Sequence, residues 1–145
     1  MKKILMPLLT LMLAALIVTG TTFSMEGHEM GESEKVGELF HKSTVDGYML
    51  SYYLMDLRKH QKKDMDKPHH IMVYIMDKNH QKVLEGKVGF MIIDSEGNSQ
   101  KIMSMFMSEG FGITADMKNK DIYTITTKAV LGDVKLMDKF TYEMK

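Results

Sequence analysis

Cysteine is absent from the 145 residues, and neither sign of charge is in excess, with 19 basic and 19 acidic side chains. Without cysteine the chain can form no disulfide, no thiolate metal site and no lipid-modified N-terminal cysteine. The balanced charge gives no indication of nucleic acid or of an anionic membrane surface as a partner. A cysteine nucleophile, a Gly-rich phosphate loop and a G-x-S-x-G elbow are also missing, and we therefore expect a protein that is not an enzyme.

Long hydrophobic runs are scarce as well, since only one occurs, from Ile4 to Val18, behind Lys2 and Lys3. Its length of about 15 residues is less than the roughly 20 that cross a bilayer as a helix. Small residues follow the run, and this pattern predicts a secretory signal peptide over residues 1–24. An uncleaved anchor is the alternative. We expect a periplasmic or secreted protein with no stable membrane span after cleavage of the signal.

The rest of the sequence divides into an arm and one β-rich domain. Residues 25–45 are rich in Gly and Glu and have little periodicity, which predicts a flexible N-terminal arm. Residues 46–145 contain short runs of alternating β-branched and aromatic residues, separated by turn sequences such as DKNHQK, DSEGNSQK and SEGFG. They predict an all-β fold, an immunoglobulin-like antiparallel β-sandwich of about seven strands. The expected strands include residues 47–57, 69–77, 87–93, 103–107, 121–130 and 134–144.

Methionine is the abundant residue that needs an explanation, with 17 in the chain, three of them in the predicted signal peptide. Its thioether is a neutral, polarisable ligand that selects soft ions, above all Cu(I). Outside the cytoplasm thiols tend to oxidise, whereas a site built from Met with an occasional His keeps its ligands. A secreted chain with no cysteine, many methionines and six histidines therefore fits the handling of copper ions.

The segment KIMSMFMSEG has three methionines at alternate positions, Met103, Met105 and Met107. Side chains at i and i+2 of a strand are about 6.6 Å apart and can lean onto one ion, whereas those at i and i+4 are about 13 Å apart and cannot. Two thioethers on one ion need sulfurs within roughly 4 Å of each other. Ser104 and Ser108 on the opposite face favour a different interpretation, in which the three methionines face inward and fill the core. The competing hypothesis makes at least one of them a ligand at the rim of a sheet.

Histidines supply the other candidate ligands. His69 and His70 begin the expected strand HHIMVYIMD, and His70 shares a face with Met72, so an imidazole and a thioether can converge there. Solvated surface histidines are the alternative. His28 in the predicted arm and Met107 are reserve candidates. The predicted copper ligands are therefore His28, His69, His70, Met72, Met103, Met105 and Met107.

Two segments, HHIMVYIMDKNHQKVLEGKVGFMIIDSEGNSQ and DIYTITTKAVLGDVKLMDKFTYEMK, together with the Met-rich segment between them, resemble the YtkA-like and CopC-like periplasmic immunoglobulin-fold modules. The resemblance implies a seven-stranded sandwich outside the cytoplasm that handles copper or another metal. His80 and Lys87 depart from the family pattern, which has Gly and Ala at these places. Only His70 and the segment from Met103 to Met107 map onto positions of the family, so only these residues receive its implied metal-binding role.

The leading hypothesis is a periplasmic or secreted metal-binding module that binds or transfers Cu(I), with a protein partner for metal transfer. One alternative is a non-catalytic interaction module whose Met-rich surface adapts to a partner. Another is an oxidant sink, in which surface methionines cycle through the sulfoxide.

Overall fold

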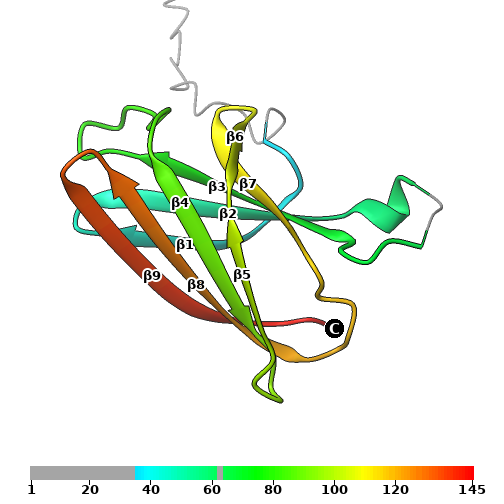
Figure 1. Cartoon of the computed structure of the whole chain (residues 1–145). Helices are drawn as coiled ribbons and strands as arrows, with labels where there is room; N and C mark the ends of the chain where they lie inside the picture. Colours follow the sequence, from blue (N-terminus) through cyan, green and yellow to red (C-terminus); the bar gives the residue numbers. More distant parts are fainter. Residues whose placement is uncertain (1–34, 62–63) are drawn as a thin grey trace, which may run out of the picture.

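Residues 35–61 and 64–145, the part of the chain that the computed structural model describes, form two antiparallel sheets that pack face to face (Figure 1). Sheet A has the strand order β1-β2-β3-β7-β6, and sheet B has the order β5-β4-β8-β9. The all-β sandwich predicted from the sequence is therefore confirmed. The predicted signal peptide, residues 25–34 of the predicted arm and the reserve ligand His28 lie outside the described residues.

The strands of sheet A are β1 (Glu38–Val45), β2 (Tyr48–Asp56), β3 (His69–Met76), β6 (Met105–Met107) and β7 (Gly110–Ala115). Those of sheet B are β4 (Lys87–Ile93), β5 (Ser99–Met103), β8 (Ile122–Leu131) and β9 (Val134–Glu143). A short 3₁₀ turn, η2 (Leu57–Lys59), follows β2. In the described part of the chain, no helix has the length and hydropathy that crossing a membrane would require.

Nine strands, rather than about seven, are present in the described residues, and β1 is the first of the differences. It lies in the segment predicted to be a flexible arm, yet it pairs with β2 from end to end. Phe40 of β1 packs against Tyr52 and Tyr142 at ring-centroid distances of 6.3 and 4.9 Å. An antiparallel strand can leave one face in water, so β1 needs few apolar residues and its polar sequence did not reveal it.

A break at Ser104 is the second difference, because it divides the Met-rich segment between the two sheets. β5 pairs with β4 as far as Met103, whereas β6 pairs with β7 from Met105 onward. Met103 and Met105, two residues apart in the sequence, therefore lie on different sheets.

The hairpin of β6 and β7 turns at Ser108 and Glu109, whose φ angles are 48° and 63°. Both residues are in the left-handed conformation, which is unfavourable for residues other than glycine. The sequence predicts a turn over the whole of SEGFG, but Gly110 and Gly112 belong to β7 instead. Glycine is therefore inside a strand here and not at the turn.

The core lies between the sheets, where the inward-facing residues of each strand meet. In β3 these are Ile71, Val73 and Ile75, as the alternation of the sequence predicts, and each is at most 2% exposed. A buried polar contact also joins the two sheets, because the Tyr52 hydroxyl of β2 donates to the Asp138 carboxylate of β9 at 2.8 Å. The inner faces are thus fully used for packing, and any binding chemistry in the strands has to come from the outer faces or the ends.

Candidate metal centre

Two predicted ligands, His70 and Met72, lie on the outer face of sheet A, because they alternate with the inward-facing residues of β3. In the neighbouring strand β7, Gly112 is paired with Met72 on one side and with Met105 of β6 on the other. Met107 is two residues further along β6 and shares the face of Met105. The strand register therefore places donors from β3 and β6 on either side of a glycine.

Three of these donor side chains converge above Gly112. A methyl group built at Gly112 would lie 2.6 Å from Met72 Sδ, 3.1 Å from His70 Cε1 and 3.2 Å from Met107 Sδ. Since both sulfurs are so close to one point, they are at most about 6 Å apart, near the roughly 4 Å that two ligands of one soft ion need. The unbranched Met side chain adapts its shape easily, so small rotations would bring all three donors onto one ion.

Space, and not backbone conformation, explains the glycine at residue 112. Its φ angle is not in the left-handed region, so another residue could adopt the same backbone. A β carbon at Gly110 would also be crowded, at 2.9 Å from the Tyr74 ring and 3.0 Å from Met72 Cε. A glycine inside a strand often marks such a close approach of other groups. At both glycines, side chains of the flanking strands occupy the space that a β carbon would take.

The imidazole of His70 is suited to binding a metal near neutral pH. Burial lowers its pKa, and a hydrogen bond with the backbone of Ile113 opposes part of that shift. A lowered pKa keeps the ring neutral, and the neutral imidazole is the form that binds metal ions.

Two tyrosines, Tyr53 of β2 and Tyr74 of β3, lie beside the site. Tyr53 is paired with Met72 and is buried, and its ring meets that of Tyr74 edge-on at a centroid distance of 5.4 Å. The Lys35 ammonium lies 5.2 and 5.6 Å from the centroids of the two rings. Met72 is consequently 0% exposed. The Met72 sulfur therefore lies in surroundings that exclude water.

The other two methionines of the Met-rich segment are exposed, Met105 at 69% and Met103 at 65%. The interpretation in which they fill the core is wrong, because the change of sheet at Ser104 turns both of them onto outer faces. Met103 lies against Gly89 of sheet B, with its Sδ 3.1 Å from a β carbon built there. It is therefore on the opposite sheet from His70, whereas Met105 is beside Gly112 on the same face as His70.

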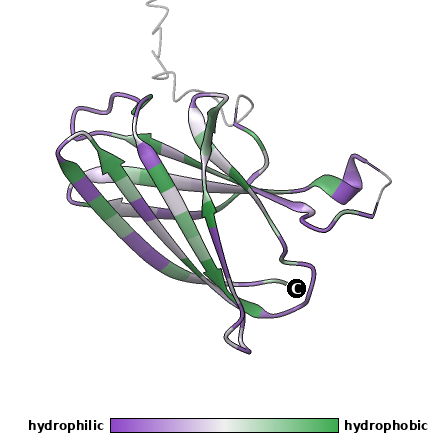
Figure 2. Ribbon diagram, viewed as in Figure 1, coloured by the Kyte–Doolittle hydropathy of each residue, from purple (hydrophilic) through white to green (hydrophobic). Residues whose placement is uncertain are grey.

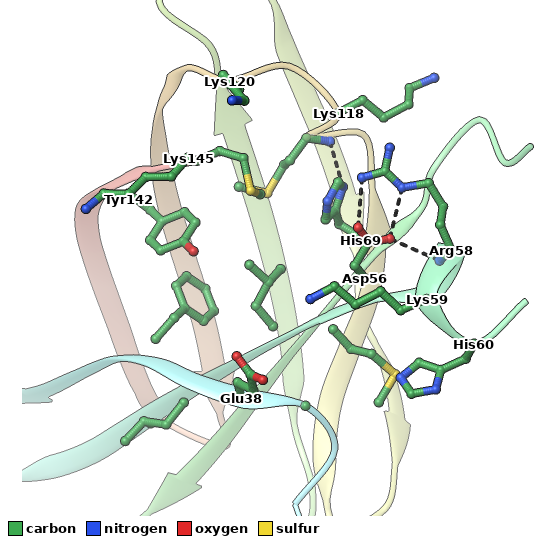
Figure 3. A pocket seen from close by; sticks show the side chains of 17 residues that line it. Glu38, Asp56, Arg58, Lys59, His60, His69, Lys118, Lys120, Tyr142 and Lys145 are labelled. Atoms are coloured by element: carbon green, nitrogen blue, oxygen red, sulfur yellow. Dashed lines mark hydrogen bonds and ion pairs between the residues drawn. The ribbon is translucent and has the colours of Figure 1, made fainter.

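His69 faces away from this site. It is 2% exposed, and its Nδ1 accepts a hydrogen bond from the Met117 N–H at 3.2 Å, so this nitrogen is not free to bind an ion. Burial lowers the pKa of His69. The residue lines a cleft of about 710 Å³ at one end of the sandwich (Figure 3). In that cleft Arg58 donates to the Asp56 carboxylate at 2.8 Å and lowers the pKa of Asp56 to about 2.

Within residues 35–61 and 64–145, no three His, Asp or Glu side chains lie close enough together to hold a metal ion. A site in this part of the chain would therefore depend on thioethers. The sequence predictions include His70, Met72 and Met107, and the structure brings these three together. Gly112 is the residue that sequence reasoning missed, because SEGFG was interpreted as a turn. Its signal was a glycine inside an apolar, strand-like run.

A scan against protein-family models and a search of curated proteins find no match to the sequence. Solved structures do match the fold. A DUF4426 family protein from Pseudomonas aeruginosa PAO1 aligns with a TM-score of 0.60 and 15% identity, over 72% of this chain and 96% of its own. A copper-bound variant of FetP from uropathogenic Escherichia coli strain F11 aligns with a TM-score of 0.53 and 12% identity, over 74% and 95% of the two chains. At these identities the similarity shows the fold alone, which is consistent with a YtkA-like or CopC-like sandwich.

Proposed function

We propose that this chain binds Cu(I) outside the cytoplasm through His70, Met72 and Met107, and that it carries or transfers the ion without catalysing a reaction. The observation that supports this proposal is the approach of two thioether sulfurs and one imidazole to within 3.2 Å of a single point above Gly112. Met105, exposed on the same face, is a further donor for an ion that enters or leaves.

The charge of the three donors favours a monovalent ion. All three are neutral, so the charge of a bound ion would remain uncompensated in a partly buried place. Such a charge is unfavourable away from water, and the cost grows steeply with its magnitude. Thioethers also prefer soft ions. Cu(I) is both monovalent and soft, whereas Zn²⁺, Ca²⁺ and Mg²⁺ are neither.

Two similarities agree with this proposal. The FetP variant that shares the fold is copper-bound. The YtkA-like and CopC-like modules, which the sequence resembles, are associated with copper outside the cytoplasm. His70 lies in the first segment that carries the resemblance, and Met107 lies in the Met-rich segment that follows it. A protein that accepts the ion from this chain is the partner that a carrier requires.

Competition for Cu(I) between the purified protein and a chelator of known affinity tests the proposal. Met72→Leu and Met107→Leu each remove one sulfur while nearly conserving volume, a change that usually costs less than about 1.5 kcal/mol of stability. Each should weaken Cu(I) binding by more than the 10- to 100-fold that is typical when only an outer-shell partner is lost, roughly 100-fold or more. His70→Gln should have a similar effect.

Met103→Leu is the matched control, because it removes an exposed thioether from the opposite sheet. Its affinity for Cu(I) should equal that of the unmodified protein. An unchanged affinity in Met107→Leu, or an equal loss in Met103→Leu, would contradict the assigned ligands. Thermal unfolding of each variant without copper separates a loss of ligand from a loss of fold.

The alternative of a Met-rich interaction surface on β2 and β3 is less well supported. It requires the aromatic and methionine side chains of these strands to be accessible. Tyr53 and Met72 are at most 1% exposed, so the middle of this face offers little apolar surface to a partner.

A further inference from the structure

The outer face of sheet B is strongly cationic. Alternate residues of its four strands point away from the core. Five of these outward residues are exposed lysines, namely Lys87, Lys101, Lys128, Lys135 and Lys139. Glu143, near the end of β9, is the single acidic residue among the outward positions of these four strands, all of which the structure describes. The equal numbers of acidic and basic residues in the whole chain conceal this separation of charge.

Strand pairing gathers the five lysines at one end of the face. Val130 of β8 lies between Lys87 and Lys135 of the neighbouring strands. Lys128 is in the next row, and the row after it has Lys101 on β5 and Lys139 on β9. Glu143 is at the opposite end, and the four rows before it, including the three that carry lysines, have no negative charge. Figure 2 shows how hydrophilic and hydrophobic residues alternate along these strands.

Within the described part of the chain, none of these five lysines forms an ion pair with a carboxylate. The ion pairs found there join Arg58, Lys82 and Lys118 to carboxylates, and none involves a lysine of this face. Exposed apolar side chains lie between the ammonium groups, with Met103 at 65% and Met137 at 62% exposure. The face therefore combines unpaired positive charge with accessible apolar atoms.

We propose that this lysine face binds the surface of a membrane that contains anionic phospholipids. Lysine is depleted in the interfaces of protein complexes, so five lysines gathered on one face are unusual for a protein partner. Near an anionic leaflet, by contrast, each lysine raises the partition coefficient by about fivefold. Its alkyl stem can lie along the apolar atoms of the sheet while its ammonium group reaches a lipid phosphate.

Docking through sheet B leaves the candidate metal centre free. The donors around Gly112 lie on the outer face of sheet A, which is the other side of the sandwich, so they would face the aqueous phase. Membrane binding uses no residue of the metal centre. Either proposal can therefore fail while the other holds.

Co-sedimentation with vesicles tests the proposal. The protein is mixed with vesicles of phosphatidylcholine alone, or with vesicles of phosphatidylcholine and phosphatidylglycerol in equal parts. The test variant carries Lys128→Gln, Lys135→Gln and Lys139→Gln. The control variant carries the same loss of charge elsewhere, through Lys42→Gln, Lys59→Gln and Lys120→Gln, three exposed lysines outside sheet B. The unmodified protein and both variants have the same N-terminal sequence, so any contribution of residues 1–34 to vesicle binding is the same in each.

The unmodified protein and the control variant should bind the anionic vesicles and not the neutral ones, and added salt should weaken this binding. The test variant should bind the anionic vesicles about 100-fold more weakly, as the loss of three lysines implies. Equal binding to both kinds of vesicle, or equal losses in the two variants, would overturn the proposal. Retention on immobilised polyglutamate without binding to anionic vesicles would also overturn it, in favour of an acidic protein partner.

Discussion

Replacing Gly112 with alanine tests the candidate metal centre most directly, because it changes the space between the ligands and leaves all the ligands in place. The added methyl group would lie 2.6 Å from Met72 Sδ. Non-bonded atoms prefer separations of about 3.5–4.0 Å, so the sulfur would have to move by about 1 Å. Met72 is 0% exposed and Tyr53 packs beside it, so the sulfur has little room in which to move.

Two consequences follow for the Gly112→Ala variant. Overpacking of this kind typically costs about 1–3 kcal/mol of unfolding free energy, because side chains leave their preferred rotamers. His70 Cε1 and Met107 Sδ, at 3.1 and 3.2 Å from the new methyl group, would also be pushed apart. A change that disturbs ligands without removing them usually weakens metal binding by about 10- to 100-fold. That loss corresponds to about 1.4–2.7 kcal/mol of binding free energy.

The assay is competition for Cu(I) with a chelator, combined with urea unfolding of the copper-free protein. Gly89→Ala is the matched control, because a β carbon there would also meet a methionine sulfur, Met103 Sδ, at 3.1 Å. Met103 is exposed and can turn into solvent, so this control should keep both its Cu(I) affinity and its stability. If Gly112→Ala binds Cu(I) as tightly as Gly89→Ala does while remaining folded, the ligands do not converge above Gly112.

Copper binding should resist acid, because burial lowers the pKa of His70 below its ordinary value of about 6.5, so protons compete less for the imidazole. In chelator competition from about pH 7.5 to about pH 5, the midpoint of the loss of Cu(I) affinity should lie below 6.5, and a midpoint above 6.5 would contradict this. Tyr52→Phe removes a hydrogen bond to the buried carboxylate of β9 and should lower the unfolding free energy in urea by about 1.5–3 kcal/mol. Tyr53→Phe removes a buried hydroxyl that has no hydrogen-bond partner in the described residues, so it should not lower the unfolding free energy. A loss as large as that of Tyr52→Phe would show that the Tyr53 hydroxyl does have a partner. Limited peroxide treatment followed by mass spectrometry should oxidise Met105, which is 69% exposed, long before Met72, which is 0% exposed, and equal rates would show that Met72 is accessible.

Local alternation made part of this structure predictable. Residues two apart in a strand share a face, so the inward row of Ile71, Val73 and Ile75 and the outward pair of His70 and Met72 could both be derived from the sequence of one strand. The sandwich could be predicted for the same reason, because each strand carries its own pattern and its own turns.

Contacts between distant strands could not be predicted in this way. Met107 and Met72 both approach Gly112 only because β7 pairs with both β3 and β6, and no local pattern encodes that neighbourhood. The change of sheet at Ser104 was equally hidden, since MSMFM alternates as regularly as an uninterrupted strand does. The net charge of the chain gives no sign of the lysine face, because the acidic residues that balance these lysines lie elsewhere in the fold. Each of these errors arose where tertiary pairing, and not local sequence, decides the outcome.

The strand that supplies Met107 has a consequence for how fast an ion could leave. β6 has three residues and forms the edge of sheet A, and it is joined to β7 through two non-glycine residues, Ser108 and Glu109, in a left-handed conformation. Segments with few contacts open locally far more often than the whole domain unfolds, and the strained turn favours that opening. Met72 and His70 are on a central strand, so they would remain bound to the ion while Met107 dissociates from it. The ion would then pass to an acceptor at the rate at which the β6–β7 hairpin opens. Three ligands could thus bind the ion tightly without making its transfer slow.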